Sequence, residues 1–289
     1  MTVSADSNDT PLNREFQSAL RDNRIPPCPI ALERLAHEMN RAEPDLRHLN
    51  QIISSDVALA AGLVKLANSP YFGAQRRISS VSEALILLGL DTASQAVACI
   101  ALAEAFPNMR SMERFWDASA QIANLSGWLA NHKQWPGVRP QEAYTFGLFR
   151  DCGIAVLLQH FPDYTRILQS ANSERMRAFT DIEDDVLPTN HVVMGALMTQ
   201  SWWLPDSICQ AVRHHHDIDP APESRDTPFR YLICISQLAE HLLQKNTGLS
   251  KTDEWEKLGT RCLEQLGISE EELADMELLA TPVVAAHAA

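Results

Sequence analysis

The sequence predicts an all-α protein built from many helices. Apolar residues recur every three or four positions, and this spacing puts them on one buried helix face, as in the stripe Phe115, Ala118, Ile122, Leu125 and Leu129. Helix-capping residues recur along the chain, whereas no segment alternates apolar and polar residues with the period of a strand. We therefore expect helices throughout, arranged as an N-terminal bundle and a C-terminal bundle that share one core.

The stretch from residue 52 to residue 106 carries the clearest helix boundaries. Asp56 is a short polar residue of the kind that caps a helix start. The spacing Ser80-x-x-Glu83 is that of a capping box, which predicts a second helix over Val81 to Leu88. Gly89 is placed for a left-handed end of that helix, and Asp91 is expected to cap a third helix.

Prolines and caps divide the rest of the chain. The segment Ile25-Pro-Pro-Cys-Pro29 is expected to be extended, because prolines fix the backbone and remove hydrogen-bond donors. Pro140 suits the first turn of a helix, and Ser269-x-x-Glu272 is a second capping box. Further helices are predicted over residues 13–21, 30–40, 44–53, 112–132, 163–173, 229–244 and 250–267, and in segments that begin near residues 188 and 205.

Composition limits the kinds of partner and site. Hydrophobic residues make up 45% of the 289 residues, enough for a sizeable core. The formal net charge is −13 and no basic run is longer than Arg76-Arg77, which argues against a nucleic-acid partner, because phosphate binding needs concentrated cationic side chains. The six cysteines are far apart and form no Cys-x-x-Cys pair, so we expect reduced core thiols.

The ends and the apolar runs of the sequence predict a cytoplasmic protein without a membrane partner. The start MTVSADSNDTPLNRE is polar and acidic, unlike a signal peptide. The longest uncharged apolar run, Thr92 to Ala103, is too short to span a bilayer. Residues 1–12 are expected to form a disordered tail.

Motifs in the central stretch resemble those of a known family. Asp56 is followed by Leu-Ala-Ala, then by K-L-A-N-S-P-Y-F-G at 65–73 and R-I-S-S-V-S-E-A-L-I-L-L-G-L at 77–90. This pattern is similar to the signature of the HDOD domain, a bacterial signalling module related to the HD superfamily of metal phosphohydrolases. The resemblance implies an HDOD domain over residues 13–245, with an N-terminal bundle (13–107) and a degenerate HD-like bundle (108–245), followed by a helical extension (246–289).

The resemblance also implies where the metal-binding residues of an HD hydrolase would fall. The first histidine would fall at Ala118, and the histidine of the His-Asp pair would fall at Arg150, so both are replaced. The aspartate of that pair is retained as Asp151. Of the later histidines, one is retained as His191 and the others among residues 214–216, as His215 or His216. The final aspartate would fall near Ser236 or Gln237, neither a typical metal ligand.

These replacements predict a degenerate site without a metal cofactor. Alanine has no donor atom, and Arg150 puts a permanent cation where a metal ion would sit. One alternative stays open, in which Asp151, His191 and His215 or His216 hold one divalent metal. In the simpler interpretation, Asp151 pairs with Arg150 or caps a helix and His191 packs at a helix start. The histidines at 214–216 are also consistent with a surface patch.

Two functions follow from these alternatives. The first is a non-catalytic signal-transduction or regulatory module that binds a protein partner or a small ligand at the seam between the two bundles and shifts their packing. The second is a divergent metal-dependent phosphohydrolase acting on a nucleotide or cyclic dinucleotide, with Arg150 as a phosphate clamp. The replaced histidines favour the first, so no catalytic residue is assigned.

Overall fold

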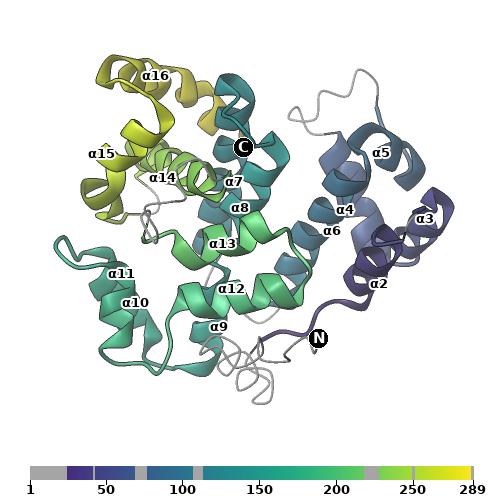
Figure 1. The fold of residues 1–289 in the computed structure, drawn as a ribbon, viewed down its shortest axis with the longest axis horizontal. Coiled ribbons are helices and arrows are strands. Elements are labelled where there is room, and N and C mark those ends of the chain that lie inside the picture. Colours follow the sequence, from purple (N-terminus) through teal and green to yellow (C-terminus); the bar gives the residue numbers. More distant parts are fainter. Residues whose placement is uncertain are drawn as a thin grey trace, which may run out of the picture.

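The computed structural model describes residues 25–41, 43–68, 77–106, 113–217, 228–248 and 251–287, and every regular element in these ranges is a helix (Figure 1). This confirms the predicted all-α fold. The predicted tail and the predicted helix at 13–21 lie outside the described residues. The helices are α2 (Ile30–Met39), α3 (Leu46–Ser54), α4 (Val57–Ala67), α5 (Val81–Leu88), α6 (Leu90–Ala105), α7 (Glu113–Lys133), α8 (Pro140–Phe149), α9 (Cys152–His160), α10 (Tyr164–Asn172), α11 (Phe179–Asp184), α12 (His191–Ser201), α13 (Asp206–His214), α14 (Pro228–Thr247), α15 (Glu254–Leu266) and α16 (Glu270–His287).

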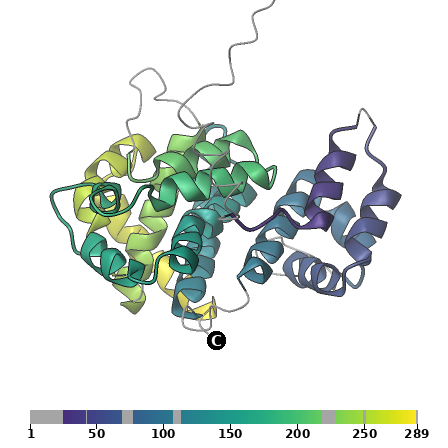
Figure 2. The same cartoon turned by 90° about the horizontal axis from the view of Figure 1, so that it is seen from below.

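The helices form two groups that lie side by side in both views (Figure 1 and Figure 2). Helices α2 to α6 make up the N-terminal bundle, and α7 to α16 make up the larger C-terminal bundle. Helix α6 joins them, because it contacts α2, α4 and α5 in its own bundle and α8 across the seam. In the C-terminal bundle, α7 packs on α8 and α14, and α12 packs on α9 and α13.

Helix starts in the N-terminal bundle follow most of the predicted caps. Asp56 accepts hydrogen bonds from two backbone N–H groups of α4, at 2.9 and 3.1 Å. Ser80 accepts the backbone N–H of Glu83 at 3.2 Å, at the predicted start of α5. The prediction for Asp91 was wrong. Gly89, with a φ of 75°, ends α5 and precedes α6 directly, so Asp91 lies in the first turn of α6 instead of capping it.

Helices α3 and α4 meet at a bend of 114°. Taken as a pair they have the length and hydropathy of a membrane span, whereas no single helix among the described residues does. Their apolar faces are turned into the protein core, where Leu49, Ile53 and Leu63 are fully buried.

The extended segment before α2 is tied to the C-terminal bundle. Trp202 follows α12, is fully buried, and packs edge-on against Phe149 of α8. Its indole N–H donates to the backbone carbonyl of Pro26 at 3.2 Å. One tryptophan therefore anchors the proline-rich segment across the seam.

Helices α9 and α12 cross at close range because a glycine lies at the crossing on each. A Cβ atom added at Gly153 would lie 1.9 Å from the carbonyl oxygen of His191 and 2.7 Å from the backbone nitrogen of Gly195. No side chain fits there, since backbone atoms cannot yield by that amount. The crossing brings the start of α12, His191, beside Asp151 at the start of α9.

Candidate functional site

Arg150 and Asp151 lie at the junction of α8 and α9. The Arg150 guanidinium donates to Asp151 Oδ2 from Nε at 3.1 Å and from Nη2 at 2.9 Å. The same Nη2 lies 3.0 Å from Oε1 of Glu240 on α14, and Nη1 lies 3.4 Å from the Ser236 hydroxyl. Arg150 is only 5% exposed, so it is a buried cation between two carboxylates. The expected pairing of Arg150 with Asp151 is present.

The pairing decides the charge of both groups. Burial alone would lower the pKa of Arg150, but Asp151 and Glu240 raise it above its ordinary value. Burial alone would raise the pKa of Asp151, but Arg150 and His215 hold it well below its ordinary value. Both groups therefore stay charged at neutral pH.

Three histidines converge beside Asp151. His191 begins α12, where the side chain of Asn190 caps the helix, and His215 and His216 follow the last residue of α13. Nε2 of His191 lies 3.2 Å from Nε2 of His215 and 3.1 Å from Nε2 of His216. Oδ1 of Asp151 lies 3.3 Å from His215 Nε2 and 4.0 Å from His191 Nε2.

Each imidazole is oriented by an acceptor on its other ring nitrogen. A backbone carbonyl oxygen and an ionised carboxylate can only accept hydrogen bonds. The Nδ1 atom that faces such an acceptor therefore carries the proton. In a neutral ring the lone pair of Nε2 then faces the centre of the cluster. The three contacts are His191 Nδ1 to Glu183 Oε2 at 2.7 Å, His215 Nδ1 to the carbonyl oxygen of Val212 at 2.9 Å, and His216 Nδ1 to Glu254 Oε2 at 2.8 Å.

The two glutamates are themselves held in place. Tyr164 donates its hydroxyl to Glu183, and Lys257 forms an ion pair with Glu254. Burial opposes ionisation of Glu254, but His216 and Lys257 lower its pKa to about 2. Both carboxylates lie in the interior, where Glu183 is fully buried and Glu254 is 5% exposed.

The donor set fits a divalent metal ion of the kind that HD hydrolases bind. One nitrogen from each of the three histidines lies within 4.8 Å of the others. Burial and the neighbouring His216 lower the pKa of His215 to about 3, so this ring is neutral at pH 7. His191, His215 and His216 would hold the ion, which when bound supplies a Lewis acid.

A cavity of about 240 Å³ opens beside the cluster. Its walls include Asp151, His216 and the methyl group of Ala118, the position at which an HD hydrolase would carry its first histidine. Arg114 and Lys251 also line it. Its volume lies below the range of roughly 300–1,000 Å³ that is usual for ligand pockets.

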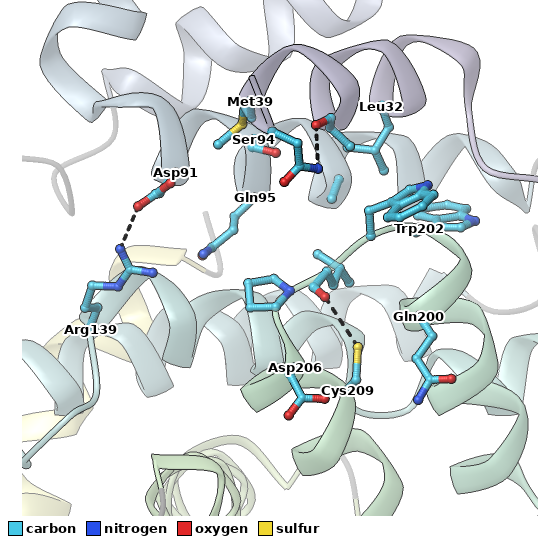
Figure 3. Close-up of a pocket in the computed structure, with 16 residues that line it drawn as sticks. Leu32, Met39, Asp91, Ser94, Gln95, Arg139, Gln200, Trp202, Asp206 and Cys209 are labelled. Atoms are coloured by element: carbon cyan, nitrogen blue, oxygen red, sulfur yellow. Dashed lines mark hydrogen bonds and ion pairs between the residues drawn. The ribbon is translucent and has the colours of Figure 1, made fainter. Parts of the chain in front are cut away.

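A larger cavity, of about 460 Å³, lies at the seam between the bundles (Figure 3). Helices α2 and α6 form one wall, and the other wall comes from the segment before α8 and from the α12–α13 region. Gln95 is 4% exposed, and its side chain points from α6 into this space. Its Oε1 accepts the Thr145 hydroxyl at 3.1 Å. At the rim, Arg139 Nη1 lies 3.1 Å from Asp91 Oδ2, so an ion pair crosses the seam.

Trp203 stands at the edge of this seam cavity. It is 65% exposed, unlike its buried neighbour Trp202. Its φ of 60° is uncommon for a bulky residue and carries a conformational cost. Trp203 lines both the seam cavity and an adjoining cavity of about 530 Å³ along α2. An exposed aromatic side chain is therefore available at the seam.

Several residues of the site were not foreseen from the sequence. His216, one of the sequence candidates, joins the cluster together with His215, although only His215 is in register with the buried face of α13. Helix α13 ends at His214, and the turn that follows directs both later rings inward. Glu183, Glu240 and Glu254 come from three other helical regions of the chain. The sequence held one signal for them. Each of these glutamates lies in a segment that also carries apolar residues of the core.

Ser236 and Gln237, where the last HD aspartate would fall, are both buried on α14. Ser236 contacts Arg150, and the Gln237 amide lies 3.4 Å from the carbonyl oxygen of His215. Neither supplies a carboxylate to the cluster.

The chain belongs to the HDOD family: the HDOD domain profile matches residues 25–218, more than half of the sequence. An uncharacterised protein from Treponema pallidum is 24% identical over 204 residues, a match that covers 70% of this chain and 40% of that protein. This chain therefore spans less than half the length of that relative.

Solved structures share the fold over nearly the whole chain. An HDOD domain protein of unknown function from Geobacter sulfurreducens is 25% identical, with a TM-score of 0.66 and 96% of both chains covered. A provisionally assigned phosphohydrolase from Shewanella amazonensis is 19% identical, with a TM-score of 0.67 and coverage of 92% of this chain and 93% of that one. A provisionally assigned signal-transduction protein from Marinobacter aquaeolei is 22% identical, with a TM-score of 0.68 and coverage of 98% and 68%.

Proposed function

We propose that this protein is a non-catalytic signal-transduction module that binds a protein partner or a small ligand at the seam between its two bundles. The observation that carries the proposal is the buried, ion-paired environment of Arg150. Its guanidinium is buried against Asp151 and Glu240, at the position where an HD hydrolase carries a metal-binding histidine.

Arg150 disfavours hydrolysis for two reasons. A guanidinium does not lose its proton in proteins, so it repels a cation placed next to it. It also occupies Oδ2 of Asp151, the carboxylate that an HD site uses as a ligand. Ala118 removes a further donor. An HD-type pair of metal ions therefore lacks the side chains it requires.

Binding at the seam is supported by size and by chemistry. The seam cavity, at about 460 Å³, falls in the usual range for ligand pockets, and the cavity beside the histidines does not. The seam also combines an exposed tryptophan with a buried amide, Gln95. An occupant with unequal affinity for two packings of the bundles would shift their populations.

Two assays test the proposal. Purified protein is incubated with Mn²⁺, Ni²⁺ or Zn²⁺ and with p-nitrophenyl phosphate, bis-p-nitrophenyl phosphate or a cyclic dinucleotide, and we expect no turnover above the metal-only background. In the second assay, partners captured from the native cell are quantified for the wild type, for Trp203→Ala, and for Leu278→Ala, which removes a similarly exposed side chain from α16. We expect one defined partner to be lost with Trp203→Ala alone. Metal-dependent turnover that Asp151→Asn abolishes would contradict the proposal.

A metal-dependent phosphohydrolase is the second candidate function, and the histidine cluster favours it. The cluster holds a metal-type donor set, and the adjoining cavity is lined by Arg114 and Lys251, which can attract a phosphate. Arg150 is less suited to binding a phosphate, because its guanidinium is already paired with Asp151 and Glu240. The turnover assay described above decides between the two functions.

A further inference from the structure

We propose that the seam cavity binds an extended segment of a partner protein that carries a basic side chain. Trp203 and Asp206 would receive the basic group, and Gln95 would donate a hydrogen bond to a backbone carbonyl oxygen of the segment. The site is the seam of the proposed function, so this inference rests on that function and adds the chemical class of its occupant.

Gln95 supplies a buried donor without a partner. Its side chain is 4% exposed and points from α6 into the seam cavity (Figure 3). Oε1 of the amide faces the Thr145 hydroxyl at 3.1 Å, which fixes the amide in place. Among the residues that the structure describes, Nε2 has no hydrogen-bond acceptor. A buried amide N–H without an acceptor costs free energy, and a carbonyl oxygen of an occupant would satisfy it.

Trp203 exposes its indole to the same cavity from a backbone position that disfavours a large residue. Helix α12 ends at Ser201, and Trp203 has the left-handed φ of 60°. The N–H of Leu204 donates to the carbonyl oxygen of Thr199 at 3.1 Å and closes the turn. Glycine or asparagine is usual at such a helix end. Because the Trp203 side chain is 65% exposed, its burial does not offset the conformational cost, which supports a role in contacting an occupant.

The charge around the seam cavity is negative. Among its described lining residues, Asp91 and Asp206 are acidic and Arg139 is basic. The guanidinium of Arg139 is shared, because Nη1 lies 3.1 Å from Asp91 and Nη2 lies 3.0 Å from Glu142. Asp206 is exposed in the first turn of α13 and has no ion-pair partner in the described part of the chain. Three carboxylates with one guanidinium favour a cationic occupant over a phosphate-bearing one.

Trp203 and Asp206 together suit a lysine or arginine side chain. They lie three residues apart in the sequence and line the same cavity. The face of an indole attracts a cation, and a nearby carboxylate supplies the opposite charge. A polyamine could use these two groups, but it has no carbonyl oxygen for Nε2 of Gln95. A peptide segment offers both the cation and the carbonyl oxygen.

The space for an occupant continues beyond the seam cavity. The adjoining cavity along α2, of about 530 Å³, has Asn40 and Trp203 in common with it. An extended chain advances about 3.3 Å per residue, so the two cavities in line suit several residues of a segment better than one compact molecule. Apart from two histidines, the charged residues of the adjoining cavity are Glu33 and Arg34, whose charges are opposite. Ile30, which is 66% exposed, adds an apolar contact there.

Peptide display tests the inference on the full chain. A phage library of random short peptides is panned against the purified protein, and the most enriched peptides are synthesised with a fluorescent label and titrated by fluorescence anisotropy. We expect lysine or arginine to be enriched beside apolar residues, and the affinity to fall as salt is added. Enriched peptides without a basic residue would overturn the inference, as would a library from which no peptide is enriched.

Three variants of the cavity lining show where the peptide binds. Trp203→Asn suits the left-handed turn, so it should keep or raise the Tm while it weakens peptide binding about 10-fold. Gln95→Met should also weaken binding about 10-fold, because the carbonyl oxygen of the bound peptide loses its donor. Asp206→Asn should weaken binding about 3-fold and reduce its dependence on salt.

The matched control for charge is Glu271→Gln, which neutralises an exposed carboxylate on α16 and should leave peptide affinity unchanged. Circular dichroism and the Tm of each variant report whether it folds. Equal peptide affinity for the wild type, Gln95→Met and Trp203→Asn would overturn the inference. Spermidine that displaces the peptide and binds Gln95→Met as tightly as the wild type would overturn the contact of Gln95 with a carbonyl oxygen. The proposed function fails separately, by metal-dependent turnover.

Discussion

The histidine cluster and the seam cavity differ in how their polar groups are satisfied. In the cluster every imidazole has a fixed partner on Nδ1, and Arg150 is enclosed by two carboxylates. At the seam the ion pair of Arg139 and Asp91 is half exposed, and an exposed tryptophan lines the opening. Buried, satisfied networks resist change, whereas loosely bridged surfaces can rearrange.

This difference assigns the two regions different tasks. The cluster retains the layout of a metal-hydrolase site but is built into the core, so it contributes to one fixed structure. The seam has room and an exposed aromatic side chain, so under the proposed function it is the region in which an occupant would alter the arrangement of the bundles. The first, second and fourth predictions below each change one of the two regions and measure whether it behaves as rigid or as adaptable, and the third concerns the N-terminal bundle.

The largest effect is expected from Arg150→Ala. The variant leaves Asp151 and Glu240 as buried carboxylates without their cation, and removing one member of a buried ion pair costs about 3–5 kcal/mol. Urea-induced unfolding followed by circular dichroism gives the change in the free energy of unfolding. A loss below about 1 kcal/mol would mean that solvent reaches the pair and that the cluster is not rigid.

Gly153→Ala is expected to cost about 3 kcal/mol or more, because the added Cβ would meet the backbone of α12. Gly62→Ala in the N-terminal bundle is the matched control. Its Cβ would meet only side-chain atoms of Ile100, at 2.8–3.1 Å, which yield more readily than backbone atoms, so a cost of about 1 kcal/mol is expected. Equal losses in thermal or urea unfolding would show that the crossing of α9 and α12 is not specially tight.

A third effect appears in acid and concerns the N-terminal bundle. The backbone N–H of Asp45 lowers the pKa of Glu38 to about 2, and His48 and Arg41 assist. Because this pKa is lowered from 4.5, the contribution of Glu38 to stability is complete above about pH 4.5 and is lost as the pH falls toward 2. The stability difference between wild type and Glu38→Gln, measured by unfolding at several pH values, should therefore shrink on acidification. A difference that does not vary with pH would exclude this role.

The smallest effect is expected at the seam. A double-mutant cycle of Asp91→Ala and Arg139→Ala should give a coupling energy below about 1 kcal/mol, since both side chains are about half exposed. Salt should reduce it further. A coupling above about 2 kcal/mol in unfolding experiments would mean that the seam is locked and unsuited to a change of packing.

The fold was largely predictable because its signals are local. The caps at Asp56 and Ser80 act within one helical turn, and the stripe that contains Ile122 and Leu125 is fixed by helical spacing alone. Asp91 was misassigned because a single glycine, Gly89, serves as the end of one helix and the start of the next. No local rule distinguishes that case from a short loop.

The sequence predicted only those site residues that fall at positions of the HD motif. Asp151, His191 and His215 were identified in this way, as was the pairing of Arg150. His216 was named as an alternative to His215, but helical periodicity could not show that both rings enter the cluster, because α13 ends at His214. Glu183 and Glu254 were missed because their burial depends on imidazoles from other parts of the chain, and charged residues are ordinarily exposed.

The most direct test of the account is a crystal structure with anomalous diffraction recorded at the zinc edge, from protein prepared with Zn²⁺. We expect no pair of metal ions beside Asp151, with Arg150 still paired to Asp151 and Glu240. Two neighbouring ions, with the Arg150 side chain displaced into solvent, would contradict it.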